Sequence, residues 1–213
     1  METVGRSVEG KVILHNVRWE TYERLLAEQV SSSAPRFTYD RGELEIMSPS
    51  TEHEEHNRTI ALLVELFAEE AGLDVRNVGS MTFRREDLGR GFEPDSCFYV
   101  QNEENVSGKA HIDLASDPPP DLVVEVDITS PSLDKLPIYA QIGVPEVWRY
   151  DGGRLEILRL ERTEYASVPR SAVLPPLTSS VLSDLLAESK VKKRRSWIRE
   201  VREWARSHAP SSD

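Results

Sequence analysis

The stretch that decides the fold is PPPDLVVEVDITSPSLDK, residues 118–135. Its apolar run predicts a β-strand at 121–128. Because side chains alternate along a strand, Glu125 and Asp127 share one face with Val123. A carboxylate pair on a buried face is costly unless water or opposite charge compensates it. The stretch therefore indicates either a strand that ends in solvent or a strand that carries a functional site.

A third acidic residue precedes another apolar segment. GFEPDSCFYV, residues 91–100, places Asp95 directly after Pro94 and ahead of an expected strand near 95–100. An Asp after Pro is often only a turn residue. If the two strands are neighbours, however, Asp95 adds an acid beside Glu125, which favours a site over a solvated strand end.

A lysine stands on the segment that follows the decisive strand. Pro137 is tolerated in the first turn of a helix but not deeper, and Gly143 is typical of a helix end. We therefore expect a short helix that begins near residues 134–136 and ends at Ile142. Lys135 would lie at its start, near the carboxyl end of the preceding strand, where open sheets hold their ligands.

These residue types suit one kind of chemistry. Two or three carboxylates bind a hard divalent cation such as Mg²⁺, which polarises a phosphate and lowers the pKa of a bound water. A lysine ammonium can orient that water or stabilise charge on the phosphorane. Phosphodiester hydrolysis fits this set better than acyl transfer does. A glycoside hydrolase is disfavoured, because Glu125 and Asp127 are too close together to flank a sugar ring.

The same residues carry a family resemblance. Asp95 after Pro94, then Glu125, then Lys135 resemble the PD-(D/E)XK nuclease superfamily. More narrowly, the segments GELEIMSPSTEHEEHN, EPDSCFYV, PPDLVVEVDITSPS and IYAQIGVPEVWRYDG resemble the bacterial Uma-two family, a group of candidate endonucleases abundant in cyanobacteria. The likeness covers roughly residues 10–187.

The resemblance implies an α/β (α+β) fold with a restriction-endonuclease-like core, a central mixed β-sheet flanked by helices. It implies Asp95 and Glu125 as catalytic residues and as ligands of Mg²⁺ or Mn²⁺. The superfamily's lysine would stand two residues after Glu125, where this sequence has Asp127. The lysine has then migrated to the following helix as Lys135, and Asp127 is a candidate third metal ligand.

Superfamily members also place an acid on the first core helix. The segment from Thr51 to about Ala71 predicts that helix, with Thr51 and Glu54 as a capping box. Glu52 and His53 are the candidates for the site, whereas Glu54 is expected to point outward. The alternative is a solvated first turn whose acids suit the helix dipole.

The rest of the chain predicts strands and helices in alternation. The remaining segments indicate a helix at 17–29, a hairpin at 36–47, strands at 73–78 and 80–84, a glycine-rich loop GRGF at 89–92, and a closing hairpin that turns at Gly152–Gly153. Such an order favours one mixed sheet with helices packed on it.

Charge divides the chain into an acidic body and a basic tail. The net charge of the 213 residues is −11, but the segment 190–206 carries +6, which leaves −17 elsewhere. We expect a nuclease-like domain at 1–187 and a basic amphipathic helix and tail at 188–213. The candidate nucleic-acid contacts are Lys192, Lys193, Arg194 and Arg195. Alternatively, this helix packs on the body or on a second subunit.

Several classes of protein are disfavoured by composition. No apolar run approaches the length of a membrane span, and the N-terminal residues lack a signal-peptide pattern. Cys97 is the single cysteine, so an internal disulfide is excluded, and we expect a cytoplasmic protein.

The sequence thus favours a Mg²⁺-dependent endodeoxyribonuclease that acts on DNA. The alternative is a non-catalytic nucleic-acid-binding or interaction module that keeps the nuclease fold. A homodimer is compatible with either.

Overall fold

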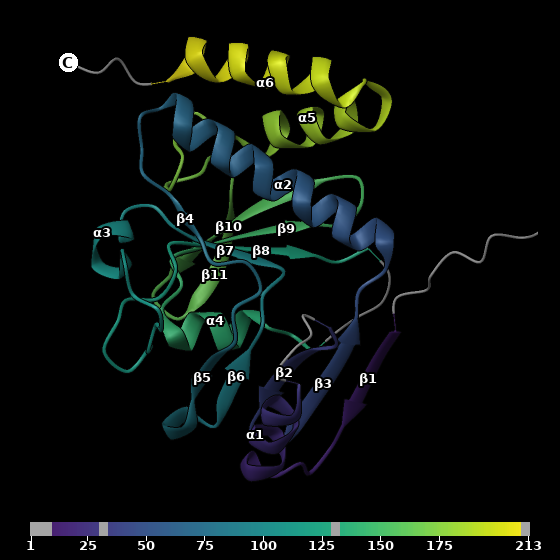
Figure 1. Cartoon of the computed structure of the whole chain (residues 1–213), viewed down its shortest axis with the longest axis vertical. Helices are drawn as coiled ribbons and strands as arrows, with labels where there is room; N and C mark the ends of the chain where they lie inside the picture. Colours follow the sequence, from purple (N-terminus) through teal and green to yellow (C-terminus); the bar gives the residue numbers. More distant parts are fainter. Residues whose placement is uncertain (1–9, 30–33, 129–132, 210–213) are drawn as a thin grey trace, which may run out of the picture.

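The structure is a computed structural model that describes residues 10–29, 34–128 and 133–209, folded into two β-sheets with helices around them (Figure 1). The first sheet contains β1 (Gly10–Leu14), β2 (Arg36–Asp40), β3 (Glu43–Ser48), β5 (Phe83–Arg85) and β6 (Arg90–Phe92). The second contains β4 (Arg76–Asn77), β7 (Ser96–Tyr99), β8 (Leu122–Val126), β9 (Glu146–Tyr150), β10 (Leu155–Glu161) and β11 (Glu164–Val168). The helices are α1 (Trp19–Glu28), α2 (Thr51–Glu70), α3 (Glu103–Val106), α4 (Leu136–Ile142), α5 (Ser179–Val191) and α6 (Arg194–His208), with a 3₁₀ turn η1 (Glu86–Leu88).

The second sheet is mixed, as expected for the fold class. Its strand order is β11-β10-β9-β8-β7-β4, and the β8–β9 pair is parallel while its other pairs are antiparallel. Helices flank this sheet, so the α+β prediction of a central mixed sheet is confirmed. The prediction of a single sheet was wrong, because the hairpin at 36–48 joins a separate antiparallel sheet with the order β1-β3-β2-β6-β5.

The first sheet also corrects a local prediction. The GRGF segment is not a loop, because its residues 90–92 form β6 between β2 and β5. Gly91 allows this close packing, since a Cβ at this position would overlap the Tyr22 hydroxyl and ring. The strands expected at 73–78 and 80–84 are shorter than predicted, as β4 and β5.

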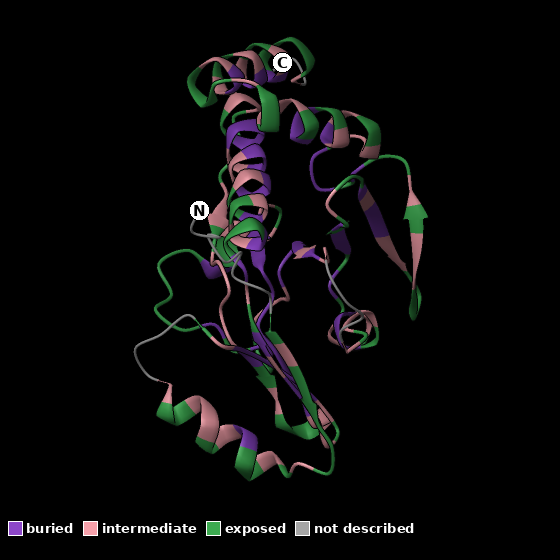
Figure 2. Ribbon diagram, turned by 90° about the vertical axis from the view of Figure 1, so that its right-hand side faces the viewer, coloured by how far each residue is buried: buried purple, intermediate pink, exposed green. Residues whose placement is uncertain are grey.

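Strand β8 is buried on both faces, which explains its apolar run. Leu122 and Val124 pack in a core with residues of α2, α5 and α6. Val123 packs on the other face with Cys97 and with Tyr139 of α4. Buried residues follow one side of α2, the side that covers the sheet (Figure 2). Helix α4 therefore packs against the face of β8 that carries Glu125.

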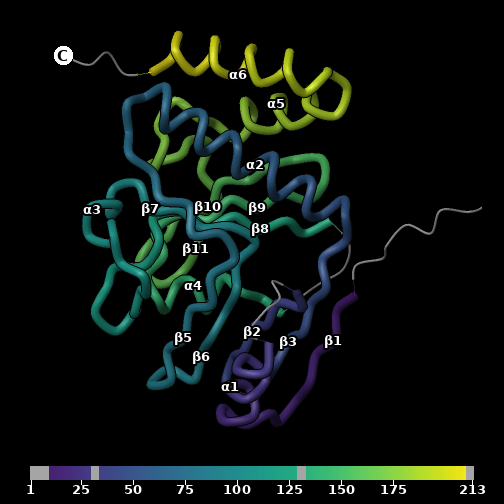
Figure 3. The backbone as a smooth tube through the Cα atoms, in the orientation of Figure 1, coloured from purple at the N-terminus to yellow at the C-terminus, as the bar shows by residue number. Residues whose placement is uncertain are grey.

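The two sheets meet where the chain passes from β6 to β7 (Figure 3). Three residues, 93–95, make this crossing. Arg90 ties the helix α4 to the same place, because its Nε donates to Asp40 at 2.8 Å and its Nη1 donates to the Pro137 carbonyl at 2.8 Å. Asp95 and α4 are thus held at the junction of the sheets.

The ends of the two site helices follow local stereochemistry. Helix α4 has Pro137 in its first turn and ends at Gly143, which has a φ of 89°. The N-cap of helix α2 lies one residue earlier than expected, because Ser50 takes this position and its Oγ accepts from the His53 N–H at 3.1 Å. The capping-box assignment to Thr51 was therefore wrong by one residue.

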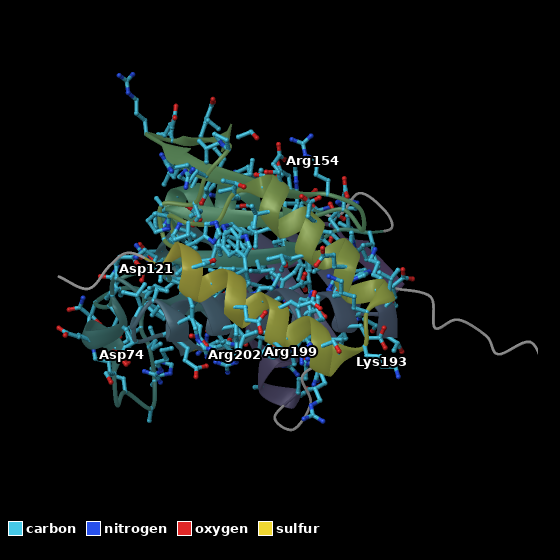
Figure 4. The ribbon with its side chains drawn as sticks, turned by 90° about the horizontal axis from the view of Figure 1, so that it is seen from above. Asp74, Asp121, Arg154, Lys193, Arg199 and Arg202 are labelled. Atoms are coloured by element: carbon cyan, nitrogen blue, oxygen red, sulfur yellow. The ribbon has the colours of Figure 1, made fainter. Side chains whose placement is uncertain are left out.

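The C-terminal helix packs on the body. Trp197 of α6 is 1% exposed, and its Nε1 donates to the Leu185 carbonyl at 2.8 Å. Arg202 and Arg206 pair with Glu70 of α2 at 2.7 and 2.6 Å. Lys193, Arg199 and Arg202 lie along α6 in Figure 4. The expected boundary at residue 188 falls inside α5.

Among the described helices, none is long and apolar enough to cross a membrane.

Gly91→Ala should lower the free energy of unfolding by about 1–3 kcal/mol, because the added methyl group overlaps the Tyr22 ring. Gly10→Ala is the matched control in the same sheet, since nothing lies within 4 Å of the position that its Cβ would take, and it should change stability by less than about 0.5 kcal/mol. Urea unfolding measures both. Equal stability of the two variants would contradict the packing described here.

Trp197→Ala should cost about 3–5 kcal/mol of unfolding free energy, because it empties a fully buried site between α5 and α6. Val191→Ala, at a position 83% exposed, should change little. An unchanged thermal midpoint of the Trp197 variant would show that the terminal helix does not contribute to the core.

Candidate active site

Asp95, the residue before β7, lies opposite Glu125 of β8. The antiparallel register pairs Ser96 with Val124 and Cys97 with Val123, so one further step sets Asp95 opposite Glu125. Directly opposed residues share a face, with Cβ atoms about 4.5–5.5 Å apart. The structure thus brings together two acids that are 30 residues apart in the sequence.

Lys135 and Tyr139 reach Glu125 from α4. Lys135 is the N-cap of the helix, and its Nζ lies 2.7 Å from Glu125 Oε2. The Tyr139 hydroxyl, one turn further, donates to Glu125 Oε1. The Pro137 and Gly143 signals therefore fix a helix that directs both side chains at the carboxylate.

Asp95 is held by groups from three other elements. Its Oδ2 accepts from the Val126 N–H of β8 at 2.7 Å. Its Oδ1 pairs with Arg36 of β2 and lies 2.9 Å from His53 Nε2 of α2. Asn57 donates to its backbone carbonyl at 2.9 Å. These bonds fix the position of a fully buried carboxylate.

The two candidate site residues of α2, Glu52 and His53, lie in different surroundings. His53 is buried against Asp95, whereas Glu52 is largely exposed and lies 3.9 Å from His56. Glu54 was expected to point outward, and it instead bonds to Arg36. The sequence missed this contact because Arg36 comes from a strand of the other sheet.

The charges of the site depend on one another. Burial opposes ionisation of Asp95, but the His53 hydrogen bond and the charges of His53, Lys135 and Arg36 outweigh it and lower the pKa of Asp95 to about 2. Burial raises the pKa of Glu125, and Asp95 adds to this rise against the opposing charge of Lys135. Burial disfavours the ammonium of Lys135, yet Glu125 and Asp95 outweigh it, so the pKa of Lys135 is raised and the group stays protonated.

A pocket of about 220 Å³ opens onto Glu125 and Lys135. Both sheets, the residues after β8 and the start of α4 contribute to its walls. Among its lining side chains are Lys11, Glu45, Glu125, Asp127, Asp134, Lys135, Tyr139 and Arg149. Asp127 lies just beyond β8, and its Oδ1 is 3.7 Å from Lys11 Nζ.

Glu45 of β3 is a site residue that sequence reasoning missed. Its side chain is buried, its Oε2 accepts from the Leu133 N–H at 2.7 Å, and its charge helps to raise the pKa of Lys135. The alternation in ELEIM was the available signal. It places Leu44 and Ile46 on one face and Glu45 on the other, between Glu43 and Met47.

The donor chemistry of the site fits a divalent cation. Carboxylates outnumber the permanently charged cations Arg36 and Lys135 in the connected set. That set holds Glu45, Glu54, Glu93, Asp95 and Glu125. The described part of the chain forms no ready-made cluster of three or more His, Cys, Asp or Glu ligands. Mg²⁺ commonly needs only one or two carboxylates, because water and substrate phosphates complete its shell. Asp95 and Glu125 provide two such carboxylates.

The four basic residues predicted to bind nucleic acid lie elsewhere, at the start of α6. Lys192 pairs with Glu188 at 2.9 Å and also with Glu200, whereas residues 193–195 are exposed. Helices α5 and α6 lie at the end of the molecule remote from the first sheet (Figure 1).

A protein-family comparison identifies the family of the chain. The model of the Uma2 family, described as "Putative restriction endonuclease", matches residues 19–189. The chain belongs to the Uma2 family. The matched residues include Asp95, Glu125 and Lys135, and they stop before α6. None of the curated proteins compared with this Uma2 chain matches it.

A solved structure is also similar to this Uma2 protein. It is a crystallised protein of Anabaena variabilis ATCC 29413, described as a putative nuclease belonging to DUF820. The two share 13% sequence identity with a TM-score of 0.48, over 84% of this chain and 96% of that chain.

Asp95→Asn should lower the free energy of unfolding by about 2 kcal/mol at pH 7, because the folded protein prefers the ionised acid. The folded pKa lies below the unfolded one, so this stability is present above about pH 4 and is lost as the pH falls through about 2. The difference between variant and wild type in urea unfolding should therefore shrink between pH 4 and pH 2. Exposed Asp74→Asn is the control and should show no such trend. A pH-independent difference would contradict the charge network.

Proposed function

We propose that this Uma2 protein is a divalent-metal-dependent endonuclease that hydrolyses phosphodiester bonds in DNA. The observation that carries the proposal is the contact of Lys135 with Glu125, with Asp95 opposite, beside a solvent-accessible pocket. The family description supports a nuclease, and the chemistry of two carboxylates and an ammonium supports a phosphate substrate.

Asp95 and Glu125 would hold the cation, Mg²⁺ or Mn²⁺. When bound, the cation polarises the phosphate and lowers the pKa of a bound water. Asp127 is proposed as a third oxygen donor, from the mouth of the same pocket. His53 and Arg36 position Asp95 by fixing its Oδ1.

Lys135 would act as a cation rather than as a base. Its raised pKa keeps the ammonium protonated near neutral pH, so it has no free lone pair to accept a proton. An ammonium in this position stabilises negative charge that develops on the phosphorane. The Tyr139 hydroxyl binds the other carboxylate oxygen of Glu125. This contact restricts the rotation of the carboxylate and keeps it in contact with Lys135.

Contacts with DNA beyond the pocket would come from exposed basic groups, of which Lys193, Arg194 and Arg195 are the proposed set, with Lys192 beside them. The proposal includes a cytoplasmic location, which is an expectation from the sequence, and it is compatible with a homodimer.

Lys135→Ala should reduce Mg²⁺-dependent cleavage of DNA by about a hundred- to a thousand-fold, as expected for loss of an electrostatic group at the reacting centre. Its Mn²⁺ affinity should be unchanged or tighter, because a positive charge leaves the site. Glu125→Ala should lose both cleavage and Mn²⁺ binding. Gel-based cleavage and calorimetric Mn²⁺ titration measure the two properties.

The matched control is Lys109→Ala, which breaks another lysine–carboxylate pair, with Asp117, outside the site. It should cleave like the wild type. Wild-type protein that binds Mn²⁺ but cleaves no DNA across single-stranded, duplex and branched substrates would reject the proposed function.

A further inference from the structure

Lys11 brings a cation to the pocket from the edge of the first sheet. In the β1–β3 register Lys11 faces Met47 and Ile13 faces Glu45, so Lys11 shares its face with two residues that line the pocket. The Lys11 side chain is mostly buried, and its Nζ lies 3.7 Å from Asp127 Oδ1. It thus spans from one sheet to the end of β8 in the other.

Arg149 brings a second cation from the other sheet. The parallel β8–β9 register sets Arg149 beside Glu125, on the same face of the sheet. Its neighbours Trp148 and Tyr150 point into the main core on the opposite face. Arg149 is exposed and lines the pocket, and its Nη2 lies 2.8 Å from Glu156.

Water reaches the acid partners of these cations. The side chains of Asp127 and Glu156 are 40% and 29% exposed. The Arg149–Glu156 pair is exposed on both sides, and such a pair contributes only about 0–1 kcal/mol, so a phosphate can take the place of Glu156. The Lys11 side chain is only 12% exposed, so a phosphate would approach its ammonium beside the more exposed Asp127. The guanidinium fork of Arg149 matches a phosphate in two parallel hydrogen bonds, and the Lys11 ammonium acts as a point charge.

The size of the pocket restricts what enters between them. Its volume of about 220 Å³ lies below the roughly 300–1,000 Å³ of pockets that enclose drug-sized ligands. A phosphodiester group fits such a space. The pocket lining contains three cations, Lys11, Lys135 and Arg149, which attract a phosphate, together with four carboxylates and several apolar side chains.

We propose that Lys11 and Arg149 form a two-point clamp that holds backbone phosphates of a nucleic acid at the mouth of the Glu125–Lys135 pocket. The clamp rests on the proposed function and extends it to the mode of recognition. It recognises the sugar–phosphate backbone without reading a base within the pocket, so substrates of different sequence engage it equally.

The test is the salt dependence of DNA binding by the full chain, measured by fluorescence anisotropy in Ca²⁺ on labelled single-stranded and duplex oligonucleotides that are shown to stay intact. Lys11→Gln and Arg149→Gln should each reduce the slope of log K against log salt by about 0.9 on duplex or about 0.7 on single strands. Each should weaken binding by about five- to tenfold at 0.1 M salt. The double variant should lose about twice the slope of either single one.

Two further variants separate a clamp from a structural tie. Glu156→Gln removes the acid that competes for Arg149, so it should tighten DNA binding, whereas a merely structural pair predicts no gain. Arg84→Gln is the matched control, because Arg84 pairs with Glu23 at 3.7 Å on the opposite edge strand of the first sheet, and it should leave the slope unchanged.

Failure of the clamp and failure of the nuclease proposal give different results. Wild-type cleavage in Mg²⁺ together with unchanged slopes in both clamp variants overturns the clamp alone. Reduced slopes in a protein that cleaves nothing support the clamp and reject the nuclease. A wild type that binds neither oligonucleotide, or clamp variants that lose only thermal stability, also overturns the clamp.

Discussion

The buried carboxylate of Asp95 is the constraint on which the site depends. It lies where the chain leaves the first sheet and enters the second, and it contacts β8 through the Val126 N–H, α2 through His53 and β2 through Arg36. A buried charge is tolerated only with such complete compensation. The same contacts therefore orient the two sheets and the first core helix around one oxygen donor.

The other charges of the site follow from this arrangement. Burial raises the pKa of Glu125, and the ionised Asp95 opposite it raises that pKa further. Lys135 offsets both acids and is held protonated by them. The network still carries more carboxylates than permanent cations, which is the electrostatic condition that favours binding of a divalent ion.

Local stereochemistry made part of this structure predictable. Pro137 and Gly143 act within a few residues of themselves, so the limits of α4 and the position of Lys135 followed from the sequence. Glu125 and Asp95 were selected as candidate site residues because a charged residue in or beside an apolar strand can be recognised from the sequence alone. The family resemblance supplied the expectation that their strands are neighbours.

Contacts between the sheets were not predictable in this way. Strand β6 exists because β2 and β5 pair with it, which its arginine and glycine residues do not reveal. Glu54 turns inward because Arg36 reaches it from another sheet, and Glu45 joins the site only because the first sheet covers the start of α4. Each depends on a long-range pairing that no local pattern encodes.

In the proposed function, Asp95 and Glu125 form one cation site. An anomalous difference map from crystals soaked in Mn²⁺ tests this site most directly. One strong peak is expected in contact with carboxylate oxygens of both residues, at about 2.0–2.6 Å. A peak that touches neither, or ordered crystals in saturating Mn²⁺ that show no peak at the junction of the sheets, would contradict it.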